Sequence, residues 1–223
     1  GHNRSEWLDL EEEKDITDFE LNSDLPYFHQ NNLAAVIAAG QALGVDLSVV
    51  DFDNFPGIAR RQSILYQGEN RTIVEDYAHH PTEINAFLSH RRLLLPRHSL
   101  QVVFQPHRFS RTQALSEKFA EELAQADDLH LLPTYAAFEK FDPSGSVENL
   151  IGYLPPRLRK RTNVFSDFSQ LCNTLGVGPD EKHKDQVLFV GAGDLEKWAH
   201  AFAAWESAKG EKLDAFSHYL RDK

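Results

Sequence analysis

Two short apolar runs in this sequence each end in a cluster of residues that carry chemistry. The run 72–74 leads into 75–84, which holds acids, a phenol and two imidazoles, and the run 100–104 leads into 105–112, which holds His, Arg and Ser. In α/β folds, functional side chains gather in the loops that follow strands. Two neighbouring strands would therefore deliver His and Arg groups to one sheet edge, which we interpret as a binding site for a small carboxylate.

The pattern around these runs predicts the fold class. Residues 63–66 and 72–74 flank Gly68-Glu69-Asn70, which is turn chemistry between the strands of an antiparallel hairpin. Strand and helix patterns then alternate. Helices are predicted from Pro81, over 113–126, over 167–175 and from Asp194, and strands over 100–104, 129–132, 163–165 and 187–190. This alternation predicts an α/β domain whose mostly parallel sheet is covered by helices on both faces.

A different pattern precedes the hairpin. Apolar residues among alanines predict a helix over 32–43 that Gly44 ends, and 53–57 breaks the pattern and is our predicted hinge. We therefore expect residues 1–54 to belong to a preceding domain and 55–223 to form the α/β domain. The chain begins Gly1-His2 and contains no Met, so we treat its amino end as a cut inside a longer protein.

Composition excludes several classes of function. The balance of 23 basic against 34 acidic residues gives a net charge of −11, which disfavours a general surface for nucleic acid or anionic membrane. A single cysteine, Cys172, excludes an internal disulfide, and no apolar stretch approaches the roughly 20 residues of a membrane span. These features favour a cytoplasmic protein, and they leave the oligomeric state open.

Arg108 and Arg111 are candidates for gripping a carboxylate or phosphate. A guanidinium can do so through two parallel hydrogen bonds, and both arginines follow the end of a strand. The alternative is that they pair with surface acids. His107 lies between the strand end and the arginines, where it could orient a ligand or accept a proton near neutral pH.

His79 and His80 follow Asp76 and Tyr77, and a carboxylate that holds one imidazole nitrogen would fix the tautomer for proton transfer. The alternative for His80 is that it only caps the helix that starts at Pro81. A zinc site made of these histidines and His107 has no supporting ligand spacing, so we predict no metal site.

Three other motifs have simpler interpretations. Gly191-Ala192-Gly193-Asp194 lacks the full G-x-G-x-x-G pattern, so close packing of a turn on the sheet is favoured over anion binding. The basic run 155–161 is interpreted as a solvated loop. The phosphate-binding pattern G-x-x-x-x-G-K-[ST] does not occur in the sequence, so this chain is not expected to turn over ATP alone.

With these residues in place, the chain resembles the carboxy-terminal half of a Mur ligase. Residues 75–84 are similar to that family's Asp-Asp-Tyr-Gly/Ala-His-His-Pro-Thr-Glu-Ile signature, and 104–112 to its Phe-Gln-Pro-His-Arg-Tyr/Phe-Ser/Thr-Arg-Thr signature. Weaker likenesses cover 135–137 and 191–194. The resemblance implies a Rossmann-like amino-acid-binding domain over 55–223, and a remnant of the ATP-binding central domain before it.

The signatures resemble the version that adds L-alanine to UDP-N-acetylmuramate. This implies an ATP- and Mg²⁺-dependent ligase of peptidoglycan synthesis that forms an acyl phosphate, with the metal ligands in the central domain. The alternatives are the related ligase that attaches a whole peptide, whose second signature differs, and a stand-alone module that binds an amino acid or nucleotide.

Carried over residue by residue, the resemblance implies that L-alanine is surrounded by Tyr77, His79, His107, Arg108 and Arg111. His79 or His107 would be catalytic, by stabilising the attacking amine.

The nucleotide would be contacted by Asp76 at its ribose, by Arg61 at the phosphates, and by Asn32 and His29 on the adenine side. Asn32 matches the second asparagine of the family's His-Asn-x-x-Asn motif, but Phe28 and His29 stand at its first two positions. Gln62 replaces the phenylalanine of a usual Arg-Arg-Phe sequence.

Overall fold

The computed structural model describes residues 27–46, 58–176 and 183–209. The chain divides into two compact units, residues 1–56 and 57–223, and each is described by itself. The domain boundary predicted after residue 54 and the predicted hinge at 53–57 lie outside the described residues.

In the first unit, helix α1 (Tyr27–Ala42) includes most of the helix predicted over 32–43 and begins five residues earlier. Gly44 follows its end at φ +68°, a left-handed conformation that glycine adopts without a steric penalty. The predicted role of Gly44 as the end of this helix is therefore confirmed.

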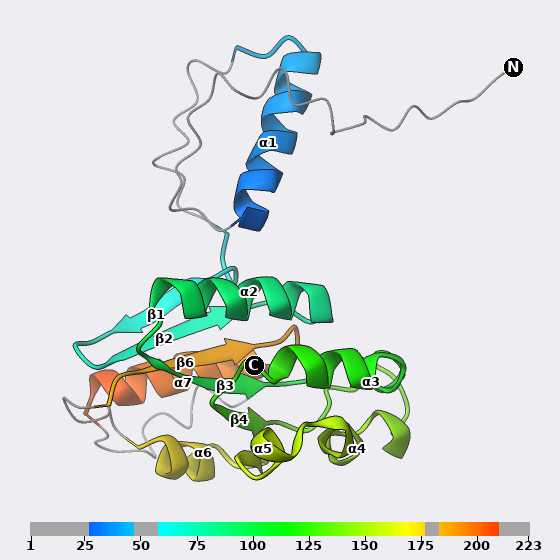
Figure 1. Ribbon diagram of the computed structural model, residues 1–223, viewed down its shortest axis with the longest axis vertical. Helices are drawn as coiled ribbons and strands as arrows, with labels where there is room; N and C mark the ends of the chain where they lie inside the picture. Colours follow the sequence, from blue (N-terminus) through cyan, green and yellow to red (C-terminus); the bar gives the residue numbers. More distant parts are fainter. Residues whose placement is uncertain (1–26, 47–57, 177–182, 210–223) are drawn as a thin grey trace, which may run out of the picture. The chain divides into compact units, whose positions relative to one another are not determined.

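The second unit is built on a six-stranded sheet with the order β1-β2-β6-β3-β4-β5 (Figure 1). Strands β1 (Ser63–Gln67) and β2 (Arg71–Asp76) form the predicted antiparallel hairpin, and every other pairing is parallel. The remaining strands are β3 (Ser99–Phe104), β4 (Asp128–Leu131), β5 (Thr162–Val164) and β6 (Asp185–Val190). The predicted α/β fold class is confirmed.

One detail of the predicted topology is wrong. Strands β2 and β3, which we expected to be neighbours, are separated by β6, which pairs with both of them. Val190, the last residue of β6, is in register with Asp76 on one side and with Phe104 on the other. The three strands therefore end level with one another, and the loops that follow them still meet at one edge.

Helices cover both faces of this sheet. On one face, a buried apolar cluster joins the sheet to α2 (Pro81–Leu94), α3 (Phe109–Leu123), α4 (Val147–Tyr153) and α5 (Pro156–Arg159). On the other face, a second cluster joins it to α6 (Phe168–Leu175) and α7 (Leu195–Ser207). Side chains alternate between the two clusters along β3: Val102 and Phe104 belong to the first and Val103 to the second.

The sequence patterns missed the short helices between β4 and β5. The 3₁₀ turn Pro143–Gly145 and α4 were not predicted, and α5 lies inside the basic run 155–161 that we interpreted as a loop. Leu150 of α4 and Leu158 of α5 are buried, so packing on the sheet stabilises these short helices. Within the described ranges, none of the helices combines the length and the apolar character that a membrane crossing requires.

Candidate functional site

The residues predicted to surround the amino acid lie at the carboxyl edge of the sheet, after β2 and β3, and the loop after β4 joins them there. The imidazole rings of His79 and His107 lie 6.1 Å apart between centroids. The ring of Tyr77 meets that of His79 edge-on at 5.3 Å, and Tyr135 stacks on His107 at 5.4 Å. The two sequence clusters therefore form one group of side chains, although β6 separates their strands.

Two groups in this cluster have a buried nitrogen without a hydrogen-bond partner. These are Nδ1 of His107 and Nη1 of Arg111, and neither has a partner among the described residues. A buried polar group that is left unpaired costs free energy, so each of these nitrogens calls for a partner that the described residues do not supply. Their position supports the predicted anion site.

The surroundings of His107 favour its neutral form. Burial lowers the pKa of His107, and the nearby Arg111, His79 and Arg108 lower it further, against the opposing effect of Glu139. An imidazole that is neutral at neutral pH can accept a proton or a hydrogen bond from an amine. The cluster therefore places two arginines close to an imidazole whose surroundings favour its neutral form.

Arg108 contacts an acidic side chain, that of Glu139. Its Nε lies 3.5 Å from Oε1 of Glu139, and its side chain is half exposed. Its backbone has φ +74°, in the left-handed region, at the start of α3. The sequence reasoning missed Glu139, which lies in the loop after β4, another strand end at the same edge.

Asp76 is buried, and both oxygens of its carboxylate are engaged by the backbone. Oδ2 accepts a hydrogen bond from the N–H of Gln62 at 3.0 Å, and Oδ1 accepts one from the N–H of Ala78 at 2.7 Å. Burial raises the pKa of Asp76, while these N–H groups and the charge of Arg61 act in the opposite direction. Nη1 of Arg61 lies 3.8 Å from Asp76 and 3.7 Å from Glu83, so Arg61 stands beside the predicted nucleotide contact.

The sequence reasoning also missed Arg60. Its guanidinium lies over the ring of Tyr77, with Cζ 4.7 Å from the centroid, and its Nη2 donates to the carbonyls of Gly191 and Gly193 at 3.2 and 3.3 Å. Nη1 also lies 3.3 Å from the carboxylate of Glu196 on α7. Arg60 therefore ties the segment before β1 to the turn after β6.

His80 and His79 have different roles. The imidazole of His80 accepts a hydrogen bond from the N–H of Thr82, and Glu83 completes a capping box, so His80 is a helix cap, as the alternative interpretation held. His79 instead holds its Nδ1 2.9 Å from the carbonyl of Tyr77. The carboxylate nearest to this imidazole is that of Glu83, at 3.5 Å, whereas Asp76 bonds to backbone N–H groups.

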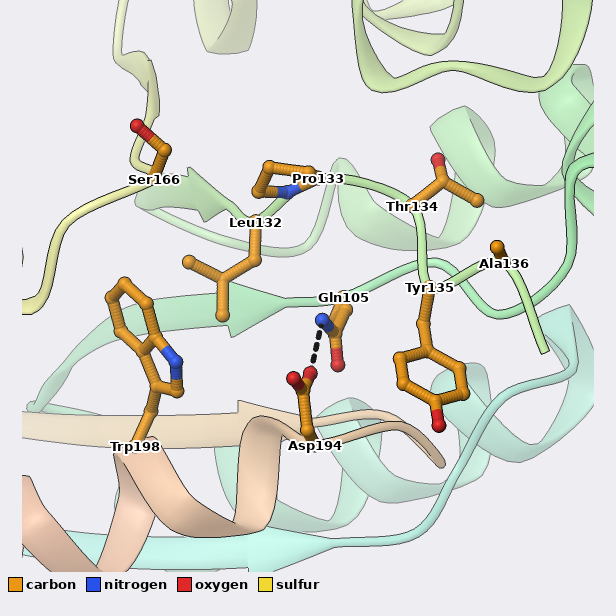
Figure 2. A pocket seen from close by; sticks show the side chains of 9 residues that line it. All are labelled: Gln105, Leu132, Pro133, Thr134, Tyr135, Ala136, Ser166, Asp194 and Trp198. Carbon is orange, nitrogen blue, oxygen red and sulfur yellow. Dashed lines mark hydrogen bonds between the residues drawn. The ribbon is translucent and has the colours of Figure 1, made fainter. Parts of the chain in front are cut away.

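A cavity of about 290 Å³ lies beside the cluster (Figure 2). Tyr135, which stacks on His107, forms part of its wall, and the other lining residues are Gln105, Leu132, Pro133, Thr134, Ala136, Ser166, Asp194 and Trp198. Nε2 of Gln105 donates to Oδ1 of Asp194 at 2.7 Å, as the dashed line in Figure 2 marks. Mixed polar and aromatic walls are typical of small-molecule sites.

The turn 191–194 packs closely on this wall, as the sequence interpretation favoured. A Cβ added to Gly193 would lie 2.4 Å from Oε1 of Gln105 and 2.9 Å from Cγ of Tyr135. One added to Gly191 would lie 2.9 Å from the carbonyl oxygen of Gln105. Both glycines are therefore required by close packing.

The remaining predicted nucleotide contacts lie on α1, in the first unit. Asn32 is exposed there, and the side chain of His29 lies outside the described residues. In the described ranges, no group of three or more His, Cys, Asp or Glu side chains could hold a metal ion.

Known proteins are similar to this chain in sequence and in fold. Residues 60–193 match the family model described as "Mur ligase, glutamate ligase domain". The chain is 34% identical over 186 residues to the UDP-N-acetylmuramate–L-alanine ligase of Ligilactobacillus salivarius, a match that covers 81% of this chain and 40% of that protein. The chain thus spans about two fifths of the length of this curated relative.

Solved structures show the same fold. The UDP-N-acetylmuramate-alanine ligase of Thermotoga maritima superposes with a TM-score of 0.65 at 27% identity, over 82% of this chain and 39% of that one. A murein peptide ligase of Psychrobacter arcticus superposes with a TM-score of 0.60 at 20% identity, over 83% and 38%, and at that identity it supports the fold alone. The family model covers more than half of the chain, and the curated relative is 34% identical over 81% of it, so the chain belongs to the Mur ligase family, the ATP-dependent amide ligases, whose C-terminal domain it contains.

Proposed function

We propose that this chain supplies the amino-acid-binding domain of a ligase that joins L-alanine to UDP-N-acetylmuramate in the cytoplasm. The observation that carries the proposal is the pair of buried, unpartnered nitrogens on His107 and Arg111, in a cluster where the His79 ring lies 6.1 Å from that of His107 and the charge of Arg108 acts on His107. An amino acid offers what this cluster lacks, a carboxylate for the cations and an amine for the imidazoles. The match to an alanine-adding relative supports alanine as this amino acid.

In this proposal Arg111 and Arg108 bind the carboxylate of L-alanine through charge-assisted hydrogen bonds. His107, neutral because burial and the neighbouring cations lower its pKa, accepts a proton from the ammonium group of alanine, and His79 lies across the cluster to hold the amine. The free amine then forms a C–N bond to the acyl carbon of a phosphorylated UDP-N-acetylmuramate. The bond from that carbon to the phosphate oxygen breaks, and inorganic phosphate leaves as hydrogen phosphate with the second proton of the amine. Positioning supplies most of the rate enhancement in such a step.

The acyl phosphate requires ATP, whose γ-phosphoryl group passes to the lactyl carboxylate. Arg61 and Asp76 are the contacts that we propose for the nucleotide from the second unit. Mg²⁺ would accompany ATP, and among the described residues no cluster of three or more ligating side chains is available for it.

Binding of L-alanine to the chain tests the proposal. We expect L-alanine to shift the imidazole resonances of His79 and His107 and the guanidinium resonances of Arg111 in NMR spectra. Propionate, which lacks the amine, and ethylamine, which lacks the carboxylate, are matched controls and should bind more weakly. Equal responses to L-alanine and ethylamine would contradict a carboxylate site at the arginines.

A second measurement tests whether this chain can carry out the ligase reaction by itself. Incubated with ATP, UDP-N-acetylmuramate and L-alanine, the chain should release no ADP, because its sequence holds no phosphate-binding loop of the G-x-x-x-x-G-K-[ST] type. Release of ADP that depends on both other substrates would show a complete catalyst and overturn this part of the proposal.

A further inference from the structure

The loop after β4 reaches across to the first turn of α3, and it does so through Glu139. Oε2 of Glu139 accepts a hydrogen bond from the backbone N–H of Ser110 at 3.0 Å, and Oε1 accepts one from the hydroxyl of Ser110 at 2.5 Å. The same Oε1 lies 3.5 Å from Nε of Arg108. One carboxylate thus contacts both the start of α3 and the guanidinium of Arg108.

The carboxylate of Glu139 caps the amino end of α3, because the cap residue of that helix makes no side-chain capping hydrogen bond. Arg108 occupies the cap position of α3, at φ +74°, and its side chain makes no capping hydrogen bond. Glu139 supplies the acceptor from another loop, at the end of the helix where the helix dipole favours a negative charge. Because Arg108 is both the cap residue and the partner of Glu139, capping and placement of the guanidinium depend on the same carboxylate.

The loop that carries Glu139 is held in an unfavourable conformation. Ala137 and Phe138 have φ +47° and φ +73°, in the left-handed region that residues with a Cβ rarely occupy. Such a conformation persists only where its surroundings fix it. Here the N–H of Tyr135 donates to the carbonyl of Pro106 and the N–H of Arg108 donates to the carbonyl of Tyr135, both at 2.8 Å, while Glu139 is anchored on Ser110. The contact to Arg108 is therefore part of a fixed framework.

The geometry of the contact leaves the ligand side of Arg108 free. Glu139 lies at Nε, on one edge of the guanidinium, and among the described residues no hydrogen-bond acceptor lies on the two Nη nitrogens. Those nitrogens form the end of the fork that binds a carboxylate. A contact at Nε fixes the plane of the guanidinium without occupying that end.

We infer that Glu139 is a positioning residue that holds the guanidinium of Arg108 toward the carboxylate of the bound amino acid. The inference deepens the proposed function and rests on it for the identity of the ligand. Glu139 itself touches no substrate in this arrangement.

The test compares Glu139→Gln with wild type in the chain itself. Gln keeps an oxygen acceptor for the N–H of Ser110 but removes the charge that holds Nε of Arg108. We expect the Nε–H resonance of Arg108, identified by its loss in Arg108→Lys, to move toward that of a solvent-exposed arginine. We also expect the affinity for L-alanine to fall about five-fold, roughly the effect of a screened ion pair that acts through a second residue.

Asp167→Asn is the matched control. Asp167 caps α6 by accepting hydrogen bonds from the N–H groups of Ser169 at 2.9 Å and Gln170 at 3.2 Å, and α6 covers the other face of the sheet. This variant loses a capping charge of the same kind and should leave both the Arg108 resonance and alanine binding unchanged. A merely structural role of Glu139 would make the two variants behave alike.

The outcomes separate this inference from the proposed function. If Glu139→Gln folds and leaves the Arg108 resonance at its wild-type position, the inference is wrong whatever alanine does. If alanine shifts no resonance of the wild-type chain, the proposed function fails, and the Arg108 resonance still reports whether Glu139 holds the guanidinium. Should Glu139→Gln unfold, Ser110→Ala removes one anchor of the carboxylate, and it should move the same resonance by a smaller amount.

Discussion

The guanidinium of Arg71 and the carboxylate of Asp185 form a buried two-point ion pair between β2 and β6. Nη2 of Arg71 lies 2.6 Å from Oδ2, and Nε lies 2.9 Å from Oδ1. Glu206 of α7 lies 3.1 Å from Nη1, and the carbonyls of Leu175 and Gly176 accept the remaining hydrogen bonds. Burial disfavours the charge, but Asp185 and Glu206 outweigh it and raise the pKa of Arg71.

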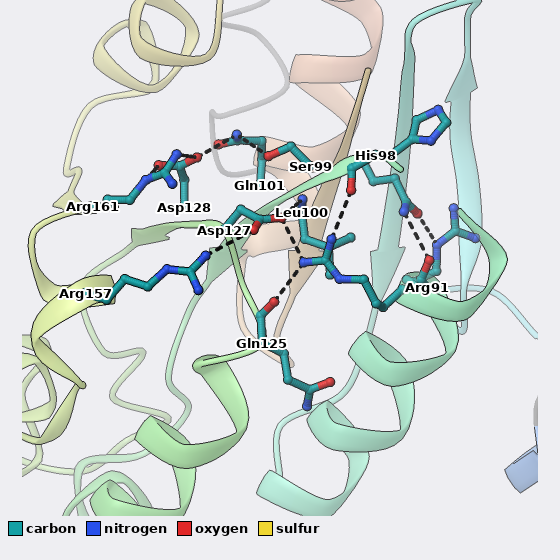
Figure 3. Close-up of polar contacts among 12 residues, drawn as sticks. Arg91, His98, Ser99, Leu100, Gln101, Gln125, Asp127, Asp128, Arg157 and Arg161 are labelled. Atoms are coloured by element: carbon teal, nitrogen blue, oxygen red, sulfur yellow. Dashed lines mark hydrogen bonds and ion pairs between the residues drawn. The ribbon is translucent and has the colours of Figure 1, made fainter. Parts of the chain in front are cut away.

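We predict that Arg71→Met destabilises the domain by about 3–5 kcal/mol, because it removes the guanidinium that the buried carboxylates of Asp185 and Glu206 share. Arg161→Met is the matched control. Arg161 makes a pair of the same two-point geometry with Asp128, at 2.7 and 2.8 Å, but its side chain is 49% exposed, so its loss should cost less than about 1 kcal/mol (Figure 3). Urea unfolding of the three proteins measures both values, and equal costs would contradict the assignment of Arg71 as a buried anchor.

The second prediction concerns pH and His130. This residue is 2% exposed, with Nε2 3.0 Å from Oε1 of Gln101 and its ring stacked on Phe165. Burial lowers the pKa of His130 to about 4, with a small opposing effect of Asp128. The folded state therefore holds the neutral imidazole, whereas the unfolded chain takes up a proton below its ordinary pKa of about 6.5.

The direction in which stability changes with pH follows from this difference in the pKa of His130 between the folded and unfolded states. The contribution of His130 to stability is complete above pH 6.5 and is lost as the pH falls toward 4, by roughly 3 kcal/mol in total. His130→Leu removes this titration, so the difference between wild type and variant should shrink or reverse as the pH falls. Urea unfolding from pH 7 to pH 4.5 measures it, and a difference that does not change with pH would contradict the prediction.

The sequence predicted the elements whose signals are local. Gly68-Glu69-Asn70 between two apolar runs predicted the hairpin of β1 and β2 because turn chemistry is encoded in a few adjacent residues. The insertion of β6 between β2 and β3 could not be predicted in this way. Asp185–Val190 lies more than 80 residues from β3 along the chain, and the pairing of parallel strands has no local sequence signal.

The same contrast between local and long-range signals holds for the candidate site. His79, His107 and Arg111 were predicted because each follows a strand end, which is a position that sequence patterns reveal. Glu139 and Arg60 were missed because their roles depend on partners that lie far along the chain. Glu139 bonds to Ser110, which lies 29 residues away in the sequence, and Arg60 bonds to Gly191, which lies 131 residues away. No local sequence pattern around Glu139 or Arg60 predicts these contacts.

The third prediction concerns Arg111, whose Nη1 is buried and unpartnered. Arg111→Met should weaken L-alanine binding by at least ten-fold, since a hydrogen bond to a charged group contributes about 1.5–3 kcal/mol. The same change should not destabilise the domain, because it removes a buried donor that has no partner. Arg91→Met is the control: Nε of Arg91 donates to Gln186 at 2.8 Å in the core, so that variant should lose stability.

We also predict that Arg111→Met changes the pKa of His107. After burial, the charge of Arg111 is the largest influence that lowers the pKa of His107, so its removal should raise that pKa. An NMR titration of the imidazole proton of His107 in both proteins measures the change. A pKa that stays the same in Arg111→Met would show that the two groups do not interact, and it would argue against a shared site.

The last prediction concerns Gly193, whose added Cβ would lie 2.4 Å from Oε1 of Gln105 and 2.9 Å from Tyr135. Gln105 is fixed on both sides, because its Oε1 also accepts the N–H of Leu195 at 3.1 Å and its Nε2 donates to Asp194. The tyrosine ring would therefore have to move away, and it stacks on His107. We expect Gly193→Ala to destabilise the domain by about 1–3 kcal/mol and to shift the His107 resonances.

Gly152→Ala is the control for this substitution. Gly152 lies inside α4, and no atom would come within 4 Å of an added Cβ. Alanine favours the helix there by roughly 0.5–1 kcal/mol, so this variant should be slightly more stable than wild type, with unchanged His107 resonances. If Gly193→Ala behaved like Gly152→Ala in both measurements, the turn after β6 would not hold Tyr135 against His107. The site would then have to be shaped by the loop after β4 alone.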